Sequence, residues 1–224
     1  MHFQKKYLQL IQQEKSNQLP NTWKVLPPSF YERDDVVTIT KELLGKIVFT
    51  NFDNVITAGK IVEAEAYNGP FDKAAHSYNN RRTKRTEVMY DHGGVAYVYL
   101  CYGIHQMFNV VTNKPGIPNA ILIRAIEPIA GIETMLKRSN KNVHGFDLTR
   151  GPGNVAKALG LHTRHSGMSL QSDQLYIVSD GCSYKENEIA VTARIGVDYA
   201  AEDVLLPYRF IVKGNKYVSG KKFV

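Results

Sequence analysis

The chain has 224 residues, with 28 Lys and Arg against 21 Asp and Glu, which gives a formal net charge of +7. A hydrophobic content of 43% with 22% charged residues is typical of a folded globular protein and excludes a disordered chain. Two cysteines are too few for a disulfide framework, and no apolar run approaches the ~18 residues of a membrane span. The positive charge favours an anionic partner: nucleic acid, an anionic membrane or an acidic protein.

The first 24 residues are predicted to be an appendage to a single domain that spans residues 25–224. Four apolar residues near the start of the chain lie at helical spacing, and a polar run and two prolines follow them. This segment lacks the continuous apolar core and the small-residue cleavage site of a secretory signal. We therefore expect a cytoplasmic protein.

A helix and then a β-hairpin are predicted to open the domain. Apolar residues at helical spacing predict a helix over residues 34–44, and Gly45 suits the position just past its end. Two runs rich in β-branched residues, 46–50 and 55–67, flank the turn-prone sequence NFDN at 51–54. This arrangement predicts a hairpin.

Short runs of β-branched and aromatic residues dominate the rest of the chain. They predict strands over residues 95–102, 107–112, 120–128, 175–179, 189–197 and 209–219. Helices are predicted over residues 131–139 and 153–161. Because the strands follow one another without regular helical crossovers, we expect an α+β domain with a curved, mostly antiparallel sheet, flanking helices and a protruding β-hairpin.

One predicted strand carries an acidic face. Its period of two places Glu63, Glu65 and Tyr67 on the same side. On its own, the pattern also fits a half-buried strand with a solvated acidic face. A long polar loop follows, however, with His76 and then a basic cluster made of Arg81, Arg82, Lys84 and Arg85. A carboxylate beside a basic loop suits an enzyme that acts on a polyanion.

Tyrosines and one asparagine mark the next two strands. Tyr97 and Tyr99 share a strand face, and Tyr102 stands beside Gly103 near a predicted hairpin tip. Strand tyrosines are often packing residues, but aromatic rings beside basic residues are also what base stacking requires. Asn109 interrupts an apolar run, so its amide either caps a backbone group or lines a polar pocket.

Arg124 lies in a run of residues that is otherwise apolar. A buried guanidinium needs a carboxylate partner, because an unpaired buried charge is costly. Glu127, Glu63 and Glu65 are the candidates.

The sequence GPGNVAKALG at 151–160 contains a G-x-G-x-x-A pattern. The residues before it, 144–150, are not a hydrophobic strand, so the context of a dinucleotide-binding site is missing. What remains is a tight turn into a helix whose free backbone N–H groups suit a phosphate, with Gly153 and Lys157 close by.

No metal or cofactor is predicted. The seven histidines are scattered, and none forms an HExxH motif or a Cys/His cluster of ligand spacing. A metal-dependent hydrolase that uses His76 with the two glutamates stays open as a minor alternative.

The accumulated strings closely resemble one family, the 3-methyladenine (alkyladenine) DNA glycosylases of the alkylpurine type. They are IVEAEAYNGPFDKAAHS, VAYVYLCYGIHQMFNV, ILIRAIEP, LTRGPGNVAKALGL, ARIGV and PYRFIVKG. The resemblance implies an enzyme that flips a damaged purine out of duplex DNA and hydrolyses its N-glycosidic bond, leaving an abasic site. It implies alkylated purines as substrates, and deaminated purines as a further class. It also implies a monofunctional, monomeric enzyme that acts on double-stranded DNA without a cofactor, a metal or a membrane partner.

The resemblance also assigns roles to residues. It makes Glu65, the glutamate before Ala-Tyr, the catalytic residue that activates a water together with Arg124. It makes Tyr102 the wedge that fills the vacated space in the duplex. The base pocket would consist of Tyr67, His76, Tyr99 and Asn109, with the asparagine disfavouring the exocyclic amine of guanine.

Phosphate contacts are expected from Arg81, Arg82, Lys84, Arg85, Gly153 and Lys157. The competing hypothesis from another class is a non-catalytic module on the same fold that binds damaged DNA or RNA.

Overall fold

A computed structural model describes residues 22–220. Its centre is a nine-stranded sheet, counted over those residues, in which neighbouring strands pair antiparallel. The strands are β1 (Lys24–Val25), β2 (Ile47–Phe52), β3 (Val55–Tyr67), β4 (Ala96–Cys101), β5 (His105–Thr112), β6 (Asn119–Ala130), β7 (Leu175–Ser179), β8 (Ile189–Thr192) and β9 (Arg209–Val212). Their order is β1-β7-β2-β3-β6-β5-β4, and β9 joins β8 to β3.

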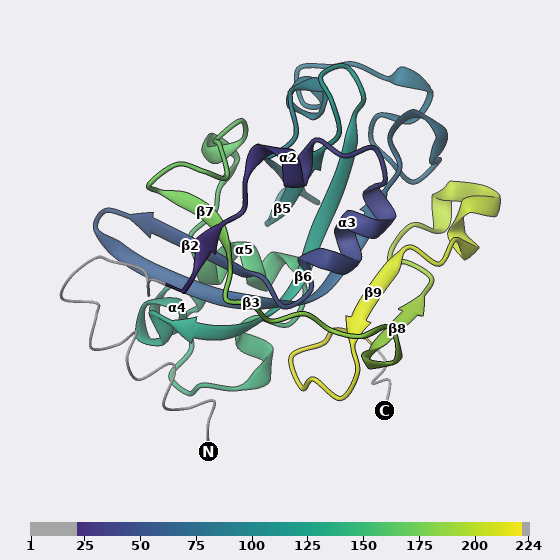
Figure 1. The fold of residues 1–224 in the computed structure, drawn as a ribbon. Helices are drawn as coiled ribbons and strands as arrows, with labels where there is room; N and C mark the ends of the chain where they lie inside the picture. Colours follow the sequence, from purple (N-terminus) through teal and green to yellow (C-terminus); the bar gives the residue numbers. More distant parts are fainter. Residues whose placement is uncertain (1–21, 221–224) are drawn as a thin grey trace.

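Figure 1 shows the long strands β3 and β6 crossing the middle of the molecule, with β9 and β8 at one side. The helices that pack on the sheet are α2 (Pro28–Tyr31), α3 (Val36–Leu43), α4 (Ile132–Ser139) and α5 (Pro152–Leu159). Together these elements confirm the predicted α+β class with a mostly antiparallel sheet.

Helix α3 shows why the predicted helices form where they do. The Asp35 carboxylate accepts from the backbone N–H groups of Val37 and Thr38, both at 3.0 Å, which satisfies two of the free donors at the helix start. Ile39 and Leu43, four residues apart on one side of the helix, are fully buried. The three longer helices lie within one or two residues of their predicted positions.

Both predicted hairpins are present. The β2–β3 turn is made by Asp53 and Asn54, which have φ values of 55° and 60°. The β4–β5 connection consists of Tyr102, Gly103 and Ile104. Its tight turn closes with a hydrogen bond from the Ile104 N–H to the Cys101 carbonyl at 3.1 Å, and its central residues Tyr102 and Gly103 have φ values of 51° and 73°. Positive φ at both central residues is the signature of the type I′ turn, whose twist matches that of the strands it joins.

Two predicted strands are too long. The strand predicted over 189–197 ends at Thr192, because the backbone N–H of Ile195 donates to a carboxylate instead of a strand and Gly196 adopts a φ of 76°. The strand predicted over 209–219 ends at Val212, because the chain turns at Gly214 with a φ of 71°. The first correction matters for function, since Ile195, Gly196 and Val197 line the site described below.

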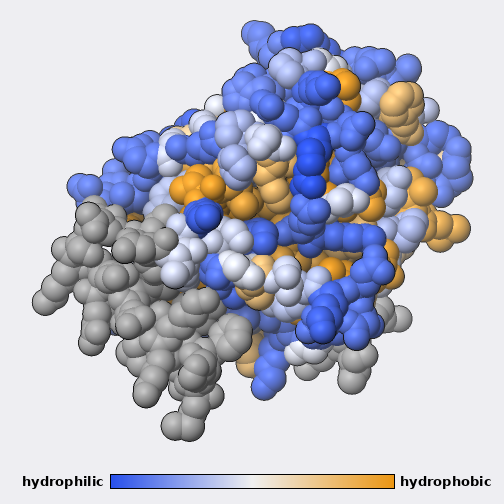
Figure 2. Space-filling model, in the orientation of Figure 1, coloured by the Kyte–Doolittle hydropathy of each residue, from blue (hydrophilic) through white to orange (hydrophobic). Residues whose placement is uncertain are grey.

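The helical stripe predicted near the start of the chain lies outside the described residues. Trp23 is buried against Phe49, with ring centroids 6.0 Å apart, and β1 follows directly and pairs with β7. The surface in Figure 2 is largely hydrophilic, with apolar residues in small patches between polar ones. No helix in the described part is long and apolar enough to cross a bilayer.

Candidate active site

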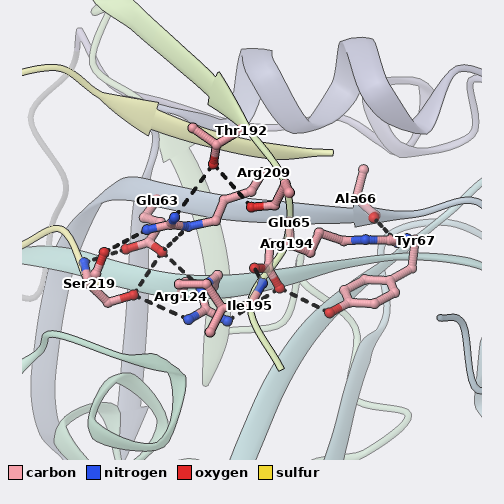
Figure 3. Close-up of polar contacts among 11 residues, drawn as sticks. Glu63, Glu65, Ala66, Tyr67, Arg124, Thr192, Arg194, Ile195, Arg209 and Ser219 are labelled. Carbon is pink, nitrogen blue, oxygen red and sulfur yellow. Dashed lines mark hydrogen bonds and ion pairs between the residues drawn. The ribbon is translucent and has the colours of Figure 1, made fainter. Parts of the chain in front are cut away.

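Strand β3 carries Glu63 and Glu65, and both side chains are completely buried. The alternative of a solvated acidic face is therefore wrong. The β3–β6 pair has three register shifts, and the one between Glu63 and Ala64 explains part of the arrangement, because the register passes from Ala125 to Ile123 and leaves Arg124 without an opposite residue. A bulge re-aims a side chain. Here it directs Arg124 toward the two glutamates, as Figure 3 shows.

Glu63 is held entirely by the protein. Oε1 accepts from Arg124 Nε, Arg209 Nε and Ser219 Oγ, each at 2.8 Å, and Oε2 accepts from the Ser219 backbone N–H at 2.6 Å. Two guanidiniums, together with the hydroxyl and the backbone N–H of Ser219, thus offset the cost of burying the charge of Glu63. Glu63 anchors Arg124 and Arg209 rather than facing a ligand.

Glu65 is held differently. Its Oε2 accepts from the Tyr67 hydroxyl at 2.9 Å and from Arg124 Nη1 at 3.3 Å, while Oε1 accepts from the Ile195 backbone N–H at 2.9 Å. A carboxylate has about two acceptor positions on each oxygen, so among the described residues one acceptor position on Oε1 has no donor. Burial raises the pKa of Glu65, and Arg124, Ile195 and Tyr67 offset only part of that rise.

A cavity of about 320 Å³ lies beside this carboxylate. Tyr67, Arg124 and Ile195, the three residues that hold Glu65, all line it. The other lining residues are Ala74, His76, Arg85, Met89, Tyr97, Tyr99, Leu100, Cys101, Tyr102, Met107, Asn109, Ala120, Leu122, Pro152, Gly196, Val197 and Tyr199. Every base-pocket residue predicted from the sequence is among them, and Glu65 lies directly behind this wall.

Aromatic rings form one side of the cavity. His76 meets Tyr99 edge-on with ring centroids 4.6 Å apart, Tyr99 stacks on Tyr97 at 5.3 Å, and His76 Nδ1 lies 2.9 Å from the Tyr97 hydroxyl. Burial lowers the pKa of His76 to about 4, helped by the positive charges of Arg85 and Arg81. His76 is therefore a neutral ring at pH 7.

Asn109 does both things that its sequence position left open. Its amide nitrogen donates to the backbone carbonyls of Tyr97 at 3.1 Å and Met107 at 3.3 Å, and the residue also lines the cavity. One of these carbonyls belongs to β4 and the other to β5, so the β4–β5 pair fixes the orientation of the Asn109 side chain.

The β4–β5 hairpin ends in an exposed apolar tip. Tyr102 is 89% exposed and Ile104 is 72% exposed. Tyr102 lies at the mouth of the cavity as one of its lining residues. A large aromatic side chain left in solvent on a tight turn has no packing role in this fold, which favours contact with a ligand.

The basic loop is exposed but not uniform. Arg81, Lys84 and Arg85 are exposed, and the Arg85 guanidinium lies 5.9 Å from the ring of Tyr99. Arg82 is also exposed, but it forms an ion pair with Glu87 through two contacts of 2.6 and 3.0 Å. Of these four residues only Arg85 lines the cavity.

Gly153 and Lys157 lie on α5, away from the cavity lining. Gly153 is in close contact with His105, since a Cβ at this position would meet the imidazole at 3.1 Å. Lys157 is exposed.

Several site residues were not found from the sequence. Ile195 contributes a backbone N–H, which has no side-chain signature. Arg209 and Arg194 are buried. Each could have been found by the argument used for Arg124, that a buried arginine needs a carboxylate partner. Ser219 meets Glu63 only through tertiary contact. Among residues 22–220, no group of three or more His, Cys, Asp or Glu side chains could hold a metal ion.

The fold and site together define a class of protein: a single α+β domain with a buried carboxylate behind an aromatic cavity, of the kind that enzymes use on flat, ring-containing ligands. The family model for methylpurine-DNA glycosylase matches residues 29–216. The chain therefore belongs to the methylpurine-DNA glycosylase family, which confirms the resemblance found in the sequence.

Individual relatives agree with this assignment. A Bacillus cereus protein is 48% identical over 203 residues, which cover 87% of this chain and 98% of the relative. A Chlamydia felis protein is 47% identical over 195 residues, which cover 86% of this chain and 98% of the relative. Both carry the provisional name 3-methyladenine DNA glycosylase.

Proposed function

We propose that this protein is a DNA repair glycosylase that removes damaged, above all alkylated, purines from double-stranded DNA. The observation that carries the proposal is the setting of Glu65: the three groups that hold its carboxylate all line one aromatic cavity, and one acceptor position remains on Oε1. A buried carboxylate with a raised pKa behind a cavity is typical of catalytic sites, which favours an enzyme over a binding module.

In this proposal Glu65 Oε1 accepts a proton from a water molecule, and the water oxygen bonds to C1′ of the deoxyribose. The N-glycosidic bond breaks and its electron pair goes to the purine. When the purine is alkylated and cationic it leaves as a neutral base, so no second carboxylic acid is required. The ionised Glu65 also offsets the positive charge that develops on an oxocarbenium-like sugar. Arg124 keeps the carboxylate in place from Oε2.

The aromatic side of the cavity suits a flipped base. Tyr67, His76 and Tyr99 offer ring faces and edges, and contact between a cationic purine and a tyrosine face adds ~0.5–2 kcal/mol. Because His76 is neutral at pH 7, it does not repel a cationic base. Asn109 is held by two backbone carbonyls and cannot move aside, so the exocyclic amine of guanine would clash with its side chain.

A base inside a duplex cannot reach this cavity, so it must be rotated out at a cost of a few kcal/mol, least for damaged or mispaired bases. Tyr102 would enter the space that the base leaves, since it is exposed on a protruding turn at the cavity mouth. Phosphates on either side would contact the basic loop of Arg81, Arg82, Lys84 and Arg85 and also helix α5, at Gly153 in its first turn and at Lys157 in its last turn.

We further propose that the enzyme is monofunctional and acts as a monomer. No lysine is among the residues that line the cavity, so no amine is placed to form a Schiff base with the sugar and cut the strand.

The test is single-turnover release of 3-methyladenine from alkylated duplex DNA in the presence of EDTA. The unmodified protein should release the base, and Glu65→Gln should bind the DNA but release it ~10²–10⁴-fold more slowly. Glu127→Gln is the control, because Glu127 accepts from Asn215 and does not line the cavity. Binding by the unmodified protein without release would overturn the proposal in favour of a damaged-DNA binding module.

A further inference from the structure

Arg194 lies in the loop that follows β8, and its side chain is completely buried. Its guanidinium forms a bidentate ion pair with Asp72, through Nη1 to Oδ2 and through Nη2 to Oδ1 at 2.8 Å. Nη1 also donates to the Ala66 carbonyl at 2.9 Å, and Nη2 donates to the Asp203 carbonyl at 3.3 Å. One side chain thus joins its own loop to strand β3, to Asp72 in the loop after β3 and to the 3-10 helix Asp198–Leu205. Figure 3 draws its contact with the Ala66 carbonyl.

Two groups beside Arg194 connect it to Glu65: the backbone of Ile195, which follows Arg194 in the chain, and the carbonyl of Ala66, which follows Glu65. The next residue, Ile195, donates its backbone N–H to Glu65 Oε1. The carbonyl that Arg194 binds belongs to Ala66, which separates Glu65 from Tyr67 on β3. The guanidinium also lies 4.8 Å from the centre of the Tyr67 ring.

We infer that Arg194, held by Asp72, is a positioning residue that sets the direction of the free acceptor on Glu65 Oε1 through the Ile195 N–H. This inference rests on the proposed function, because it assigns to that acceptor the attacking water.

The physical reason lies in how a carboxylate is oriented. Oε2 is held by two side-chain donors, Tyr67 and Arg124, but the only donor to Oε1 in the described residues is a backbone N–H in a loop. Residues 193–197 are not in a strand, so no sheet hydrogen bonds keep this N–H in place. Its position depends on the Arg194 contacts. Misplacing a reacting group by about 1 Å can cost ~10²-fold in rate.

The inference distinguishes Arg194 from a residue that only stabilises the fold. Removing a fold-stabilising arginine lowers the melting temperature and leaves each folded molecule unchanged. Removing Arg194 should also change Glu65, since a hydrogen bond to a carboxylate favours its charged form. With the Ile195 N–H displaced, Glu65 should hold its proton to a higher pH.

The experiment compares Arg194→Met and Arg194→Lys with Arg138→Met. Arg138 is a matched control, because it is a half-buried arginine that donates to the Ala158 carbonyl at 3.1 Å and to Thr57 Oγ1 at 3.2 Å, and it lies outside the cavity. In protein labelled with ¹³C at the glutamate carboxyl carbon, the signal of Glu65 is identified by its absence in Glu65→Gln. It is then followed against pH in each folded variant. Single-turnover base release is measured on the same samples.

Both Arg194 variants should shift the Glu65 titration to higher pH and slow base release by ~10–100-fold with duplex binding retained. Arg138→Met should do neither. Arg194→Lys keeps the positive charge beside Asp72, so a shift in this variant reports lost positioning, whereas in Arg194→Met the lost charge also raises the pKa of Glu65. Arg194→Lys therefore decides the test, and it also serves if Arg194→Met does not fold. A Glu65 titration that matches that of the unmodified protein in the Arg194 variants would overturn the inference. If the unmodified protein releases no base, the proposed function fails, while the titration still decides whether Arg194 controls Glu65.

Discussion

Glu63 and Glu65 lie two residues apart on β3 and share the Arg124 guanidinium, which donates through Nε to Glu63 at 2.8 Å and through Nη1 to Glu65 at 3.3 Å. Both carboxylates are completely buried. Glu63 has a second guanidinium and two groups of Ser219, whereas Glu65 has a phenol and one backbone N–H. The pair therefore separates an anchoring carboxylate from one that can act on a ligand.

The first prediction concerns stability. At pH 7, Glu63→Gln should lower the free energy of unfolding by about 3–5 kcal/mol, because it removes the buried carboxylate that Arg124 and Arg209 share, although Arg124 keeps its contact with Glu65. Glu65→Gln should unfold at the same or a higher temperature. The pKa of Glu65 is raised in the folded protein, so its ionised form at pH 7 is less favourable there than in the unfolded chain. Calorimetry at pH 7 checks both variants, and equal losses would contradict the distinction between the two glutamates.

The second prediction concerns pH. In the proposed mechanism base release requires ionised Glu65, and burial raises the pKa of Glu65 above the ordinary value of 4.5. The rate should therefore fall as pH decreases through that raised pKa, which places the acid limb above 4.5. A pH series of single-turnover rates on one alkylated duplex measures the limb.

His76 provides the control for this limb. Burial lowers its pKa to about 4, opposite in direction to the rise at Glu65, and His76 contributes stability that is lost as pH falls from about 6.5 toward 4. His76→Gln should slow base release but leave the acid limb in place. A limb that moves with His76→Gln would assign the titration to His76 instead of Glu65.

The third prediction concerns the hairpin tip. Tyr102→Ala should slow base release from duplex DNA by about tenfold or more, since an aromatic stack on a base contributes ~1–3 kcal/mol. Release from single-stranded DNA should change less, because no vacated space has to be filled. Phe71→Ala is the control, as Phe71 is 80% exposed but does not line the cavity. Equal losses on both substrates would argue against a wedge.

The fourth prediction concerns the basic loop. Each lost phosphate contact should reduce the slope of log affinity against log salt by about 0.9. Lys84→Ala should show this reduction. Arg82→Ala should show a smaller one, because Glu87 already compensates the Arg82 charge. Binding is best measured in the Glu65→Gln background, where the substrate stays intact. A larger effect from Arg82 than from Lys84 would show that the ion pair with Glu87 opens on DNA.

The sequence by itself determined the local structure and the family. Each local feature depends on residues close together in the chain. Examples are the alternation on β3, the helical spacing before Gly45 and the turn at Asp53 and Asn54. The strings around Glu65 and Tyr102 were specific enough to indicate the methylpurine-DNA glycosylase family, which the family model confirms.

Only the tertiary structure decided how the charges are arranged. Arg124 had three candidate carboxylates, and the bulged register of β3 and β6 selects Glu63 and Glu65, while Glu127 accepts from Asn215 instead. The loop at 193–197 has the composition of a strand, yet it leaves the sheet because its groups find buried partners far away in the sequence. Burial and pairing of charge depend on which distant segments meet, and no local pattern encodes that.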